Sequence, residues 1–113
     1  AVKARDSKRD SLEVARLKVA SKLRKNRAYF LAPASNDRPD LVYTERGGLY
    51  SIGVKYGNRY LSGIFDGGNY LTDVDPSAVP ELLEMLASDA AAGMFDGQIQ
   101  AIMLANVAAK RRI

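Results

Sequence analysis

The chain has 113 residues and a formal net charge of +4, with 47% hydrophobic and 27% charged residues. This balance is typical of one globular domain, and the chain is too short for two. Cysteine and histidine are both absent, which excludes disulfides, thiolate catalysis and the usual general base near neutral pH. No apolar run approaches the roughly 20 residues of a membrane-spanning helix. We therefore expect a cytoplasmic protein, or one from the interior of a virion if a phage encodes it.

The charge is unevenly distributed along the sequence. Residues 1–27 carry ten Lys/Arg against three acids, residues 28–109 carry four against ten, and residues 110–112 are all basic. An acidic body with basic ends is typical of proteins that bind a polyanion with their extremities. The alternative is a solvated helix face followed, at the other end of the chain, by a soluble tail.

The first predicted element is a basic helix over residues 11–26. Ser11 is a plausible N-cap, and Leu12, Ala15, Val19 and Leu23 recur at helical spacing. Basic residues crowd the end of this helix, where cations also suit the helix dipole. Residues 28–32 read as a short strand closed by Pro33, and residues 33–39 read as a loop.

Three two-residue turn signals follow in series: Gly47-Gly48, Gly57-Asn58 and Gly67-Gly68. Each lies between runs rich in Tyr, Val, Ile and Leu, which indicates tight hairpins. The turns predict strands near 41–46, 49–56, 59–66 and 69–73. They also fix a register in which Thr44 pairs with Ser51, Val42 with Gly53, Lys55 with Tyr60 and Gly53 with Ser62.

Alternation along these strands separates two faces. The predicted core face collects Leu41, Tyr43, Tyr50, Ile52, Val54, Tyr56, Leu61 and Phe65. The other face collects Thr44, Arg46, Ser51, Gly53, Lys55, Tyr60 and Ser62, and we expect a helix to cover only one end of it. Gly53 would keep this surface low, so that a nucleic-acid strand could approach the backbone.

Two amphipathic helices are predicted after the sheet. The first carries Val79, Leu82, Leu83, Leu86 and Ala90 and ends at Gly93. The second spans about 98–111, and its broad apolar face favours a homo-oligomer, with a dimer as the first guess. Asp73 and Asp75 could bind a hard cation, but a cap on the following helix is the better interpretation.

The predicted fold is therefore α+β: an antiparallel β-meander of four to five strands with an N-terminal basic helix and two C-terminal amphipathic helices. We expect one domain over 1–113, with a basic arm at 1–10 that could be flexible, a helix at 11–26, the sheet at 28–73 and helices at 77–111. In topology alone, without a shared motif, a meander followed by a helix is similar to small sheet-based proteins that bind single strands.

The predicted function is sequence-tolerant binding of nucleic acid, single-stranded DNA or RNA, through the sheet face and the basic ends. A cationic groove with aromatic platforms is the usual solution for single strands. The candidate residues are Lys8, Arg9, Lys22, Arg24, Lys25, Arg27, Arg46, Lys55, Arg59, Tyr60, Lys110, Arg111 and Arg112. We expect no catalysis, cofactor, metal or membrane contact. The alternative is an oligomeric structural or protein-interaction subunit, such as a phage or mobile-element factor.

Overall fold

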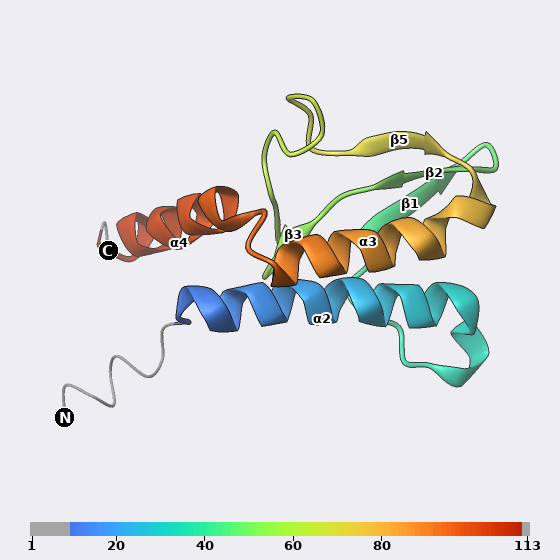
Figure 1. Cartoon of the computed structure of the whole chain (residues 1–113), viewed down its shortest axis with the longest axis horizontal. Helices are drawn as coiled ribbons and strands as arrows, with labels where there is room; N and C mark the ends of the chain where they lie inside the picture. Colours follow the sequence, from blue (N-terminus) through green and yellow to red (C-terminus); the bar gives the residue numbers. More distant parts are fainter. Residues whose placement is uncertain (1–9, 112–113) are drawn as a thin grey trace.

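The computed structural model describes residues 10–111, and side chains up to Ala109. Two helices form one layer and a small sheet forms the other (Figure 1). Helices α2 (Leu12–Leu31) and α3 (Val79–Ala91) lie side by side and antiparallel, while α4 (Asp96–Arg111) extends past the N-terminal end of α2. None of the described helices is both long and apolar enough to cross a membrane.

Helix α2 is longer than the sequence predicts. Ser11 is its N-cap, with the Val14 N–H donating to Ser11 Oγ at 3.1 Å. The helix then continues to Leu31, so the predicted end at residue 26 and the predicted strand at 28–32 are wrong. No helix breaker precedes Pro33, and Phe30 contributes to the core from the helix, packing edge-on against Tyr43 and Tyr50 at centroid distances of 5.4 and 5.2 Å.

The first predicted hairpin is confirmed. Strands β1 (Tyr43–Arg46) and β2 (Leu49–Ile52) pair around Gly47-Gly48, with Thr44 opposite Ser51. The Gly53 N–H donates to the Val42 carbonyl at 2.8 Å, as the predicted register requires.

The predicted meander is wrong beyond β2. The next strand in the sheet is β5 (Leu71–Val74), which pairs with the other edge of β2 and gives the order β1-β2-β5. The short strands β3 (Lys55–Tyr56) and β4 (Arg59–Tyr60) form a separate hairpin around Gly57-Asn58, in the predicted register. Gly53 and Val54, which were expected to continue β2, lie between the two sheets.

The third predicted turn is displaced by one residue. Phe65 and Gly68 form an isolated bridge, so the turn residues are Asp66 and Gly67 rather than Gly67 and Gly68. Both have positive φ, at 47° and 84°, as an Asp-Gly type I′ turn requires. This turn does not bring a long strand back, because the flanking residues are irregular.

The C-terminal elements follow the prediction closely. Asp75 caps the 3₁₀ turn η2 (Pro76–Ala78) through a 2.9 Å bond from the Ser77 N–H, and η2 leads directly into α3. Gly93, at φ 89°, follows α3, and α4 begins two residues before the predicted 98. A second 3₁₀ turn, η1 (Pro33–Ser35), follows α2.

The core lies between the helix layer and the sheet. Its largest fully buried side chains include Leu23 of α2, Ile52 of β2, Leu83 of α3 and Ile99 of α4. Of the predicted core face, Ile52, Val54 and Leu61 are buried and the other five are half-buried. The core face is therefore confirmed in its centre, and its half-buried margin consists of Leu41 and four aromatic side chains.

Candidate nucleic-acid interface

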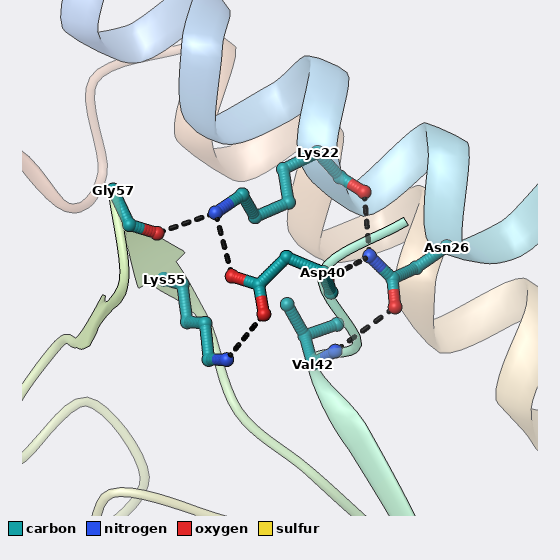
Figure 2. A network of polar contacts seen from close by, with 6 residues as sticks. All are labelled: Lys22, Asn26, Asp40, Val42, Lys55 and Gly57. Carbon is teal, nitrogen blue, oxygen red and sulfur yellow. Dashed lines mark hydrogen bonds and ion pairs between the residues drawn. The ribbon is translucent and has the colours of Figure 1, made fainter. Parts of the chain in front are cut away.

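Two of the predicted phosphate ligands, Lys22 and Lys55, both bond to the carboxylate of Asp40 in the same chain. Lys22 Nζ lies 2.9 Å from Asp40 Oδ2 and Lys55 Nζ lies 3.0 Å from Asp40 Oδ1 (Figure 2). Lys22 also donates to the carbonyl of Gly57. Hydrogen bonds from Lys22 and then Lys55 hold the pKa of Asp40 below its usual value. The two lysines therefore tie α2, the loop before β1 and the β3–β4 hairpin together.

Asn26 completes this network from the buried side. Its side chain is fully buried, and its Nδ2 donates to the carbonyls of Lys22 and Asp40 at 2.9 and 3.1 Å. Its Oδ1 accepts the Val42 N–H at 2.9 Å (Figure 2). A buried amide with all these partners fixes where the chain enters β1.

The structure corrects the picture of a low, open sheet face at Gly53. The ring of Tyr60 occupies that space, because a Cβ on Gly53 would lie 2.5 Å from two of its ring carbons. Lys55 Nζ lies 4.8 Å from the centroid of the same ring, and Tyr70 packs edge-on at 5.0 Å. The side chain of Lys55 is only 12% exposed. Gly53 therefore serves internal packing.

Most of the remaining cations on α2 also have acidic partners. Arg24 bonds Glu84 of α3 at 3.0 Å, and Lys18 bonds Asp10 at 2.8 Å. Arg16 Nε lies 2.8 Å from Asp96 Oδ1 at the start of α4. Arg27 is half-buried, and its Nε has no hydrogen-bond partner among the described residues. Helix α2 is therefore a largely neutralised surface.

Four exposed cations form no ion pair within residues 10–109. These are Lys25, Arg38, Arg46 and Arg59. Arg46 borders the β1–β2 turn, which lies at the opposite end of the long axis from α4 (Figure 1). The sequence therefore identifies the basic residues but not which of them are already paired.

A shallow groove of about 390 Å³ lies between the β3–β4 hairpin and α4. Residues 59, 60 and 62 form one wall, and the first turns of α4 form the other. Its lining residues are Arg59, Tyr60, Ser62, Gly97, Gln98, Ala101, Ile102 and Ala105. Arg59 and Tyr60 were candidates from the sequence. The α4 residues were not, although Gln98, Ala101, Ile102 and Ala105 recur at helical spacing.

The ends of the chain carry all of the net positive charge. Residues 10–109 contain ten Lys/Arg and twelve Asp/Glu, whereas residues 1–9 and 110–113 each have an excess of three positive charges. The predicted ligands Lys8, Arg9 and Arg112 lie outside the described residues, as does all of the predicted arm at 1–10 except Asp10. The side chains of Lys110 and Arg111 are not described. The first turn of α2 and the last turn of α4 lie at the same end of the molecule (Figure 1).

Several carboxylates of the described region bond to the protein's own side chains or backbone. Asp75 caps η2, and no group of three or more Asp or Glu within that region is placed to hold a metal ion. Asp10 accepts a 2.6 Å bond from the Tyr56 hydroxyl. Burial, and then this bond, raises the pKa of Tyr56 to about 12.

The chain matches no protein-family model, no curated protein and no solved structure.

Proposed function

We propose that the protein binds single-stranded nucleic acid without catalysis and without strong sequence preference. The observation that carries this proposal is the separation of charge. Residues 10–109 have a net acidic balance and half of their Lys/Arg in ion pairs, whereas the basic segments 1–9 and 110–113 adjoin the first turn of α2 and the last turn of α4, which lie at one end of the molecule (Figure 1). Phosphate contacts supply affinity without sequence information. The sheet face has a smaller part than the sequence suggests, because Lys55 is bound to Asp40 and the ring of Tyr60 fills the space at Gly53.

The test is a salt titration of binding to a labelled single strand and to a duplex with the same number of phosphates. Replacing Lys110, Arg111 and Arg112 by Gln should weaken binding at least tenfold and flatten the salt dependence, since about 0.7 counterions are released per phosphate on a single strand. The matched control replaces Lys25, Arg38 and Arg46 by Gln, which removes the same charge from the body. Equal losses in both variants would contradict the proposal, as would tighter binding to the duplex.

The second candidate function is an oligomeric protein-interaction subunit. The observation that favours it is the apolar exposure near α4, where Leu104 is 70% exposed and Met94 69% exposed. Single exposed apolar residues are ordinary, but a projecting helix without charge between residues 97 and 109 is also suited to packing on another helix. A mass measurement of wild type and Leu104→Glu tests this. A stable oligomer that Leu104→Glu dissociates, with no nucleic-acid binding at low salt, would favour this function over the first.

A further inference from the structure

The groove between the β3–β4 hairpin and α4 has the size of a small-molecule subsite. Its volume of about 390 Å³ lies at the lower end of the range for ligand pockets, roughly 300–1,000 Å³. Such a space accommodates one flexible unit of a polymer, and it is too small for a duplex.

The residues that line the groove carry one positive charge and no negative charge. Arg59 is its only charged lining residue, is exposed, and forms no ion pair within the described region. The nearest acid in sequence, Asp96, is bound to Arg16, which holds the pKa of Asp96 below its usual value. Gly97 and Gln98 lie in the first turn of α4, where N–H groups lack intrahelical acceptors and the helix dipole favours an anion.

Apart from Ser62, the rest of the lining is apolar or aromatic. Ala101, Ile102 and Ala105 present small and apolar side chains from α4. The ring of Tyr60 is fixed by the close approach of Gly53 and by the edge of Tyr70, so it needs no ordering when a ligand binds. An aromatic ring beside a cation that has no acidic partner in the described region, as Tyr60 is beside Arg59, is a combination that holds an unpaired base and its phosphate.

We propose that this groove binds one unpaired nucleotide of a bound single strand. The phosphate lies on Arg59 and the first turn of α4, and the base packs against Tyr60 and the alanines of α4. The inference rests on the proposed function and adds the place where the strand leaves the basic ends and meets the body. From Ala105, α4 rises about 8 Å to Lys110, so a strand in the groove is within reach of the basic C-terminal segment.

Filling the groove tests the proposal. Ala101 is exposed and lines the groove, whereas Gln100 is exposed on the same helix and does not line it. In the full chain, Ala101→Phe should raise the Kd for a labelled 12-mer of thymidylate about tenfold, the effect of losing roughly one stacked base. Gln100→Phe should change it less than twofold. Circular dichroism and thermal melting show whether each variant is folded.

A second pair of variants tests the charge without adding bulk. Arg59→Gln should lower the slope of log K against log salt by about 0.7, whereas Arg46→Gln should leave the slope unchanged. An oligoglutamate of equal charge should compete poorly, because it has no base to stack on Tyr60.

The outcomes separate this inference from the proposed function. If the wild-type chain fails to bind the thymidylate strand at low salt, both the proposed function and the proposed role of the groove are wrong. If the wild type binds but Ala101→Phe matches Gln100→Phe, and Arg59→Gln matches Arg46→Gln, only the groove is wrong. Equal competition by oligoglutamate would show that base stacking adds nothing to binding, which also contradicts the groove proposal.

Discussion

The buried side chain of Asn26 accepts the backbone N–H of Val42 at 2.9 Å, sixteen residues further along the chain. This bond joins the C-terminal part of α2 to the residue just before β1. Because it is the buried acceptor for Val42, the position of the whole β1–β2 hairpin relative to α2 depends on it.

We predict that Asn26→Leu lowers the free energy of unfolding by about 2–3 kcal/mol. Leucine has the same branched shape and number of side-chain heavy atoms as asparagine, but it leaves the Val42 N–H without an acceptor in a buried place. The matched control is Asn36→Leu, because Asn36 also bonds backbone carbonyls but is exposed. Urea denaturation measures both. An equal cost in the two variants would show that burial of the bond does not matter.

Gly53→Ala should destabilise the protein by about 1–3 kcal/mol, the usual cost of overpacking. The added Cβ would overlap the Tyr60 ring and lie 3.3 Å from the Asn69 carbonyl. In a Tyr60→Ala background the same substitution should cost measurably less, because the ring is gone. Gly97→Ala is the control, since nothing lies within 4 Å of its added Cβ. Additive costs of the two substitutions in the double variant would contradict the packing of Tyr60 on Gly53.

Alkaline pH should destabilise the protein through Tyr56. An unfolded tyrosine loses its proton near pH 10, whereas in the folded chain burial and then the bond to Asp10 raise the pKa of Tyr56 to about 12. The unfolded state therefore releases the proton first, and this part of the stability is complete below pH 10 and is lost between about pH 10 and 12. Urea midpoints of wild type and Tyr56→Phe should converge over that window. A constant difference between them, with Tyr70→Phe as the exposed control, would contradict this.

Asp40→Asn should strengthen binding to a single strand by more than its change in net charge explains. The substitution removes the carboxylate that Lys22 and Lys55 share, so both ammonium groups become available to phosphate. Asp37→Asn makes the same charge change in the same exposed loop, and Asp37 forms no ion pair in the described region. The salt slope for Asp40→Asn should be steeper than that for Asp37→Asn by about 0.7 or more. Equal slopes would mean that the lysines remain bound elsewhere.

The sequence predicts local structure well where a side chain acts on its own neighbours. The cap at Ser11, the turn at Gly47-Gly48, the β3–β4 register and the helix end at Gly93 are all local features, and the structure confirms them. The strand at 28–32 fails because tyrosine, phenylalanine and leucine fit either element, and the contact of Phe30 with Tyr43 and Tyr50 decides in favour of the helix.

The pairing of β5 with β2 could not be read from turn signals. A serial meander is the default for successive tight turns, but the turn at Asp66-Gly67 closes only one bridge. Because β3 and β4 form a separate hairpin, the edge of β2 away from β1 is left for another strand, and β5 pairs there. The bulge between the two β2–β5 pairs, with Asp73 at φ 58°, fits the irregular register of this pairing.

The sequence predicts which residue types the candidate site contains, but not which of its basic side chains already have an acidic partner and are therefore not available to a ligand. Lys22, Arg24 and Lys55 were selected as cations, and the structure gives each an acidic partner distant in sequence. The groove combines Arg59 and Tyr60 with α4, about forty residues later, so no spacing rule within the sheet could join them.

The base of the β3–β4 hairpin is held in the core, which bears on how the hairpin can vary in evolution. Val54 and Leu61 are both fully buried, and the Leu61 N–H donates to the Val54 carbonyl at 2.8 Å. These two anchors hold the hairpin to the core, while the six residues between them project toward solvent, the polar network and the groove. Sequence drift can therefore alter the exposed residues Asn58 and Arg59 at the tip of the hairpin, while Val54 and Leu61 preserve the scaffold.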